Sequence, residues 1–211
     1  LGRQHIRPPA VAGMFYPDSP SRLSREIAAM LADAAGKAEE CPKAIIVPHA
    51  GYIYSGPIAA SAFAILAGRR TAIHRVVLLG PTHRVAVRGL ALPDCDAFAT
   101  PLGNVPIDRS AADAIRDLPQ VVVSDPAHRQ EHSLEVEIPF LQVVLGEFSL
   151  LPIAVGEASP DAVAEVLAYV YKLDPQLVNR EALASGELEL GPLGAGDAEI
   201  LRDLLEQHRT E

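Results

Sequence analysis

Two stretches, Lys43-Ala-Ile-Ile-Val-Pro-His49-Ala-Gly-Tyr52 and His74-Arg-Val-Val-Leu-Leu-Gly-Pro-Thr-His83, decide the expected fold of this 211-residue chain. In each of them a short apolar run leads through a proline or a Gly-Pro turn to a histidine. Continuous apolar runs of this length are typical of strands buried in a parallel sheet. We therefore predict strands over residues 43–48 and 75–79. His49 and His83 then lie at the carboxyl edge of the sheet, where open α/β sheets bind ligands.

The rest of the chain alternates between helical and extended patterns. Helices are predicted over residues 20–35, 57–67, 108–118, 133–145 and 158–170, further strands over 120–123 and 148–154, and a hairpin-like extended segment over 86–101. Pro139 should either kink its helix or mark the effective start. After residue 173 the periodicity is weak until a short helix over 198–206. This alternation predicts an α/β fold, a three-layer sandwich with a mostly parallel central sheet.

Composition excludes several classes of protein. Hydrophobic residues make up 49% and charged residues 21% of the chain, as in ordinary globular proteins, and the net charge of −9 disfavours a nucleic-acid or anionic membrane surface. The apolar runs are too short to span a bilayer, and no signal-peptide pattern opens the sequence. The two cysteines, Cys41 and Cys95, form no close-spaced motif, so neither a disulfide framework nor a cysteine-rich zinc site is expected. We expect a cytoplasmic protein.

The strand-end histidines allow two interpretations. Neutral imidazole is a common metal ligand, and His49 and His83 could share one ion if their strands are neighbours. Alternatively, they only cap strand ends by bonding backbone carbonyls, and spacing alone weights both interpretations equally. Tyr52 follows His49 closely, so its hydroxyl could donate a hydrogen bond to a bound substrate. The simpler role for Tyr52 is to pack its ring and satisfy its hydroxyl locally.

A third polar cluster, Glu131-His132-Ser133, lies in a polar loop just before an amphipathic helix. His132 could be a metal ligand, a proton carrier in catalysis or a hydrogen-bond partner of a ligand. Glu131 could orient an imidazole by accepting a hydrogen bond from it. Helix capping by Ser133 is the alternative, and spacing alone slightly favours it.

Five motifs in a fixed order resemble the Memo family, whose prokaryotic members are called AmmeMemoRadiSam system protein B. They are Arg7-x-Pro-x-Val-Ala-Gly-x-Phe-Tyr-Pro17, Pro48-His-Ala-Gly-Tyr-x-Tyr-Ser-Gly56, Gly80-Pro-Thr-His83, Thr100-Pro-Leu-Gly103 and Glu131-His-Ser-Leu-Glu-Val-Glu-x-Pro-Phe-Leu141. The resemblance covers about residues 7–168, within a single Memo-like α/β domain over residues 1–211. It implies a fold similar to class III extradiol ring-cleaving dioxygenases, which use non-haem iron.

In that family His49 and His83 would correspond to two metal ligands, for iron(II) in the first place and copper as the alternative. A Cys-Gly motif near the C-terminus supplies the usual third ligand, and a Ser-Asp-x-x-His motif adds an aspartate and a histidine. Neither motif follows residue 168 here, and Ala182-Leu-Ala-Ser185-Gly186 stands where a Cys-Gly motif would be expected. Either residues 169–211 are divergent and truncated, or a segment near 169–190 is missing from the sequence.

Three functions remain open from the sequence. The first is a metal-dependent redox protein of dioxygenase-like type, with His49 and His83 on the ion and His132 as the proton carrier. The second is a non-catalytic module that binds a peptide or small ligand in the same cleft. A zinc hydrolase that uses Glu131 ranks last, because no His-Glu-x-x-His helix is present. The expected partner is a small molecule or a peptide, and apolar residues of the N-terminal arm could support a dimer.

Overall fold

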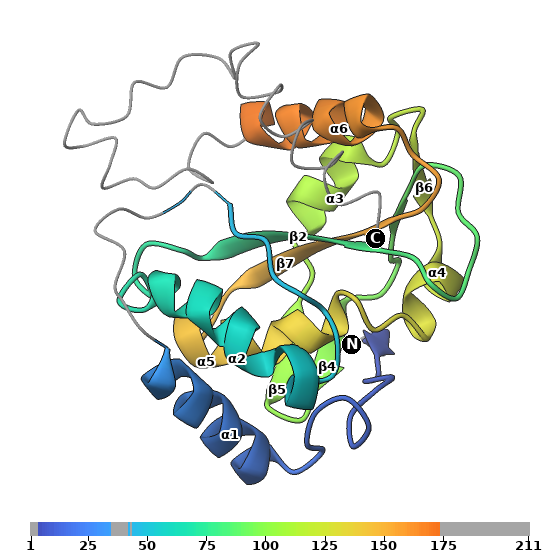
Figure 1. Ribbon diagram of the computed structural model, residues 1–211. Coiled ribbons are helices and arrows are strands. Elements are labelled where there is room, and N and C mark those ends of the chain that lie inside the picture. The colour runs from blue at the N-terminus through green and yellow to red at the C-terminus, as the bar shows by residue number, and fades with distance from the viewer. Residues whose placement is uncertain (1–3, 35–41, 43, 174–211) are drawn as a thin grey trace, which may run out of the picture.

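The computed structural model describes residues 4–34, 42 and 44–173 and places helices on both faces of a four-stranded sheet (Figure 1). The strand order is β2 (Arg75–Pro81), β7 (Ser149–Val155), β3 (Leu90–Leu92), β6 (Val121–Val123). β7 is parallel to β2 but antiparallel to β3, while β3 and β6 are parallel. The sheet is therefore mixed, and the prediction of a mostly parallel sheet is wrong. The connection over residues 82–89 contains no helix and is too short for a parallel crossover, so β3 runs in the direction opposite to β2, with β7 between the two strands.

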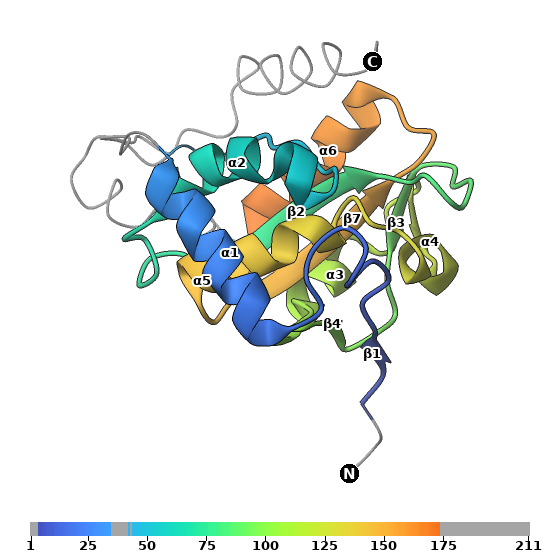
Figure 2. The same ribbon diagram turned by 60° about the horizontal axis from the view of Figure 1, so that its bottom comes forward.

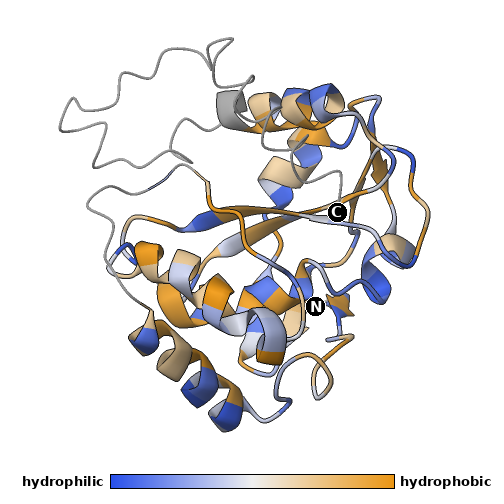
Figure 3. Cartoon of the chain, in the orientation of Figure 1, coloured by the Kyte–Doolittle hydropathy of each residue, from blue (hydrophilic) through white to orange (hydrophobic). Residues whose placement is uncertain are grey.

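The side chains of β2 alternate between two hydrophobic clusters, one on each face of the sheet. Val76 and Leu78 pack into the first cluster and Val77 and Leu79 into the second. The first cluster is covered by α1 (Pro20–Asp33), α2 (Tyr52–Phe63) and α5 (Ile138–Leu145), and the second by α3 (Arg109–Ile115) and α6 (Pro160–Leu173). The outer side of α1 is hydrophilic (Figure 3). The arrangement is an α/β fold compatible with three layers.

A second, smaller sheet joins the N-terminal arm to the body of the protein. It consists of β1 (Ile6–Arg7), β4 (Ala97–Thr100) and β5 (Gly103–Pro106), with β4 in the middle (Figure 2). β1 is parallel to β4, and β5 is antiparallel to it across a tight turn at Gly103, whose φ of 125° favours glycine. The hairpin predicted within residues 86–101 is wrong, because β3 and β4 belong to different sheets.

The strand predicted over residues 43–48 does not form in the part of this segment that is described. Residues 44–48 are extended, and they alternate as a strand does, with Ile45 and Val47 half-buried against the first cluster and Ile46 55% exposed. Among the described residues, however, no backbone hydrogen bond joins residues 44–48 to a neighbouring strand. The apolar run predicted an extended segment correctly, but the exposed side chain of Ile46 is at odds with a strand buried on both faces, and the expected parallel pair with β2 is absent from the described part of this segment.

The helix predicted from residue 57 begins earlier, at Tyr52. A Cβ on Gly56 would lie 2.6 Å from Met30 Sδ, so this glycine allows close packing of α1 on α2. Gly56 is therefore a packing glycine within a helix. η1 (Ala64–Leu66) extends α2, and α4 (Asp125–Arg129) lies inside the predicted loop before Ser133.

Helix starts with a clear signal were predicted well. α1 and α6 begin at their prolines, Asp108 caps α3 by accepting a hydrogen bond from the Ala111 N–H, and Pro139 marks the effective start of α5 after η2 (Glu135–Glu137). The weakly periodic segment after residue 173 and the helix predicted over 198–206 lie outside the described residues. Of the helices that are described, none has the length and apolar character needed to cross a membrane.

Candidate metal centre

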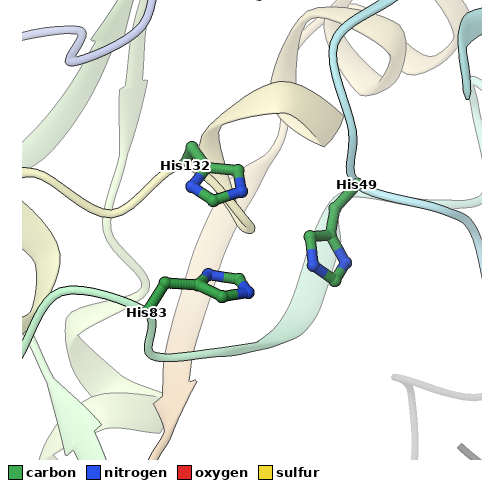
Figure 4. Close-up of side chains that lie close together, drawn as sticks. All are labelled: His49, His83 and His132. Carbon is green, nitrogen blue, oxygen red and sulfur yellow. The ribbon is translucent and has the colours of Figure 1, made fainter. Parts of the chain in front are cut away.

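Three imidazoles from distant parts of the chain meet at the carboxyl end of β2 (Figure 4). His49 follows the extended segment and precedes α2, His83 lies in the loop after β2, and His132 lies in the turn between α4 and η2. Each offers one nitrogen, and these three atoms all lie within 4.8 Å of one another. The structure thus brings the two strand-end histidines together and adds His132, which the sequence analysis had assigned chiefly to proton transfer.

The geometry of the three rings is close to what one ion requires. The ring centroids of His83 and His132 are 4.6 Å apart and nearly parallel, and His49 lies 5.3 Å from the first and 5.9 Å from the second. Ion–nitrogen bonds of about 2.1 Å place neighbouring ligand nitrogens roughly 3–3.5 Å apart. The nitrogen separations, none longer than 4.8 Å, are therefore close to this spacing. Three imidazoles suit zinc, iron, copper or nickel rather than calcium or magnesium.

Glu131 fixes the orientation of His83. Its Oε1 lies 2.8 Å from His83 Nδ1, and it also accepts hydrogen bonds from the backbone N–H groups of His83, His132 and Ser133. Burial alone would raise the pKa of Glu131, but these hydrogen bonds, led by that from the His83 ring, lower it to about 2. The ionised carboxylate must accept the proton on Nδ1, which leaves Nε2 of His83 as the nitrogen free to bind an ion.

The surroundings of the other two imidazoles, His49 and His132, favour the neutral form that binds metals. Burial is the main cause that lowers the pKa of His49, and the neighbouring His83 and His132 lower it further. Burial also lowers the pKa of His132, against the opposing charge of Glu131. Because a protonated imidazole cannot ligate, this environment favours metal binding near neutral pH.

The N-terminal arm positions the turn that contains Glu131 and His132. Arg7 donates from Nε to the His128 carbonyl at 2.9 Å, from Nη2 to the Glu131 carbonyl at 2.6 Å, and from Nη1 to the Glu135 carboxylate. Glu135 also accepts from the Tyr16 hydroxyl at 2.6 Å, and burial together with this carboxylate raises the pKa of Tyr16. Arg7 and Tyr16 lie in the first family motif and Glu131 and Glu135 in the last, but no local pattern in the sequence predicted that they meet.

Two more contacts bring the turn against β2 and against the arm. Ser133 Oγ donates to the Pro81 carbonyl at 2.8 Å. A Cβ on Gly80 would lie 2.7 Å from Ser133 Oγ, so only glycine allows this close approach. The ring of Phe15 lies 4.8 Å from the ring of His132 and covers one side of it. Phe15 was not among the predicted site residues, and its place within the first motif was the only signal for it in the sequence.

Tyr52 does not face the imidazoles as a hydrogen-bond donor. Its side chain is 4% exposed, its ring packs against Tyr16 and Phe140, and its hydroxyl donates to the Val136 carbonyl at 2.8 Å. The hydroxyl is therefore already used inside the core. The structure agrees with the packing role for Tyr52 and removes it from the candidate catalytic groups.

A first prediction concerns Glu131. We expect Glu131→Gln to weaken metal binding by roughly 10–100-fold, because the His83 ring loses the carboxylate that orients it. Competition with a chelator of known affinity measures this change, and Glu147→Gln, at an exposed position, is the matched control. Equal metal affinity in the Glu131→Gln variant and the control would show that the carboxylate does not support the site.

Comparison with known proteins agrees with the motifs. The family profile described as "Memo-like protein" matches residues 7–180. A "MEMO1 family protein" of Thermotoga neapolitana is 36% identical over 178 residues, which are 79% of this chain and 64% of that protein. Another, of Ignicoccus hospitalis, is 34% identical over 211 residues, which are 95% of this chain and 73% of that protein. The chain thus spans less than two thirds of the length of the Thermotoga relative. With this profile match and these identities, the chain belongs to the Memo family.

Proposed function

We propose that this chain binds one metal ion through His49, His83 and His132 and acts as a metal-dependent redox protein similar to non-haem iron dioxygenases. The observation that supports this most is the convergence of the three ligand nitrogens within 4.8 Å, with one ring held by a buried carboxylate. We assign iron(II) first and copper as the alternative, because imidazole ligands suit both. In this proposal the role of His132 changes from proton carrier to third ligand.

Each residue of the site has a defined task in this proposal. A bound iron or copper ion would supply one-electron chemistry and open coordination positions. Glu131 holds the proton of His83 on Nδ1, so that Nε2 would be the nitrogen available to hold the ion. Phe15 excludes water from one side of His132, and the half-exposed ring of His83 leaves the site open to a small molecule on another side.

Metal analysis of the purified protein tests this proposal. We expect stoichiometric iron or copper in the natural chain and its loss in a His49→Ala/His83→Ala variant. His74→Ala is the control, because this ring contacts the Thr71 carbonyl, away from the three imidazoles, and the variant should keep its metal. Zinc in place of iron or copper would contradict the redox assignment and favour hydrolysis.

The second candidate is a non-catalytic module that binds a peptide or a small ligand in the same place. The near-parallel packing of the His83 and His132 rings, at an interplanar angle of 21°, favours it, because this arrangement needs no ion. A protein that is free of metal and gains none when iron(II) or copper is added would support this second function and exclude the first.

A further inference from the structure

We propose that residues 198–206 pack as a helix against the outer face of α2, so that the C-terminal part of the chain covers the helix that follows His49. Two apolar faces of the same chain support this packing, one on α2 and one within residues 198–206. Neither face depends on a bound metal ion, so the packing holds whether or not the proposed function is correct.

The helix α2 is apolar on both of its sides, and it contains no charged residue. Its inner side packs into the core, while its outer face is defined here as Ile53, Tyr54, Pro57, Ile58 and Ser61. On that face Ile53 is 85%, Tyr54 79% and Ile58 64% exposed. The outer side of a surface helix in a globular protein usually carries charged residues, and a helix that is apolar all round is usually buried. No element among the described residues covers this face, so its cover must come from elsewhere.

Residues 198–206, Ala198-Glu-Ile-Leu-Arg-Asp-Leu-Leu-Glu206, have the complementary pattern. Their apolar side chains recur at the spacing of the outer face of α2, where positions 53, 54, 57 and 58 share one stripe; they are Ile200, Leu201, Leu204 and Leu205. The charged side chains fall on the opposite side of such a helix; they are Glu199, Arg202, Asp203 and Glu206. So short a helix is marginal in water by itself, so it needs an apolar surface to pack against.

The covalent link favours this segment over other occupants of the outer face of α2. Residues 174–197 join it to α6, and an extended chain of this length spans roughly 80 Å, more than the diameter of a domain of this size. Tethering raises the effective concentration of the segment to about the millimolar range, well above that of a second copy in a micromolar solution. A membrane surface fits less well, because interfacial helices carry Lys or Arg beside their apolar face and α2 contains neither.

The covered face begins close to the candidate metal centre. The first residue of α2, Tyr52, lies shortly after His49, and its backbone N–H donates to the Phe15 carbonyl at 2.8 Å. The ring of Phe15 in turn lies 4.8 Å from the ring of His132. Residues 198–206 would therefore pack on the helix whose start is joined to two of the three histidines.

Hydrogen exchange of the backbone amides, followed by mass spectrometry, tests this packing. We expect the amides of residues 198–206 to be protected in the natural chain and to exchange about tenfold faster or more in Ile58→Asp, because a carboxylate replaces an apolar contact. Val123→Asp is the matched control, since it places the same charge at a valine of β6 that is 45% exposed, and it should leave this protection unchanged. Leu204→Asp removes the other side of the contact without altering α2, and it should speed exchange within residues 53–61.

Four other results overturn the packing. Residues 198–206 that exchange without protection in the natural chain form no docked helix. Protection that persists in Ile58→Asp means that the segment packs elsewhere, and an equal loss in Ile58→Asp and Val123→Asp means that the outer face of α2 has no special part in it. Light scattering that shows a dimer of the natural chain and a monomer of Ile58→Asp assigns this face to a second copy.

Discussion

Arg7→Met is expected to lower the free energy of unfolding by about 3–5 kcal/mol, because it leaves the Glu135 carboxylate buried without its cation. The side chain of Glu135 is fully buried and that of Arg7 is 6% exposed. The arginine also donates to the carbonyls of His128 and Glu131 and lies over the Phe98 ring, 4.9 Å from its centroid. Equilibrium unfolding in urea, with the slope compared between variants, measures the change.

Two further variants identify the cause of that loss. Arg109→Met removes an arginine from an ion pair in which both side chains are more than a third exposed, so it is expected to have little effect. Arg7→Met/Glu135→Gln removes both buried charges and should be more stable than Arg7→Met alone, because no unpaired carboxylate remains. If the double variant is as unstable as the single one, the loss comes from packing and not from the isolated charge.

The single variant Arg7→Met should also affect the metal site. Arg7 holds the carbonyl of Glu131, the residue that orients His83, and thereby the turn that presents His132. We expect Arg7→Met, under conditions where it remains folded, to retain less metal than the natural chain. The arm thus links the stability of the fold to the geometry of the site.

Local signals predicted much of the fold, and long-range pairing explains what they missed. Prolines at helix starts and apolar runs located α1, α6, β2 and β7. The order and sense of the strands depend on which edges meet, and no short pattern encodes this, so the mixed sheet was not predicted. Gly56 illustrates the same limit, because its role is set by Met30 of another helix.

In the candidate site, too, local patterns predicted some residues and long-range contacts determine the others. His49 and His83 were predicted from their places after apolar runs, and Glu131 was predicted to orient an imidazole. The contact of Arg7 with Glu135 joins residues 128 positions apart, so only the folded chain reveals it. Tyr52 shows the opposite case, in which closeness in sequence to His49 suggested a role that the packing of its ring does not support.

Glu137→Gln is expected to stabilise the protein at alkaline pH. The side chain of Glu137 is 4% exposed, and within the described part of the chain neither of its carboxyl oxygens has a hydrogen-bond partner. Burial therefore raises the pKa of Glu137 from 4.5 to about 8. An amide of the same shape does not ionise, so the variant avoids the cost of a buried charge.

The free energy of unfolding falls as the pH rises, because the pKa of Glu137 is 4.5 in the unfolded chain and about 8 in the folded protein. Below pH 4.5 the carboxyl group is protonated in both the folded and the unfolded chain, so its contribution to stability is fully present. As the pH rises towards about 8, the unfolded chain releases a proton that the folded protein keeps, so the free energy of unfolding falls. Above that value the folded protein releases the proton too, and the loss levels off.

The difference in unfolding free energy between Glu137→Gln and the natural chain isolates this effect, because all other titrations are common to both. We expect this difference to grow in favour of the variant by roughly 2–4 kcal/mol between pH 4.5 and 8.5. Glu147→Gln is the control, since water solvates an exposed carboxylate in both states, and its difference should stay nearly constant. A difference that is equally flat for Glu137→Gln would mean that the buried carboxyl group has a partner in solution, such as an internal water that satisfies its oxygens.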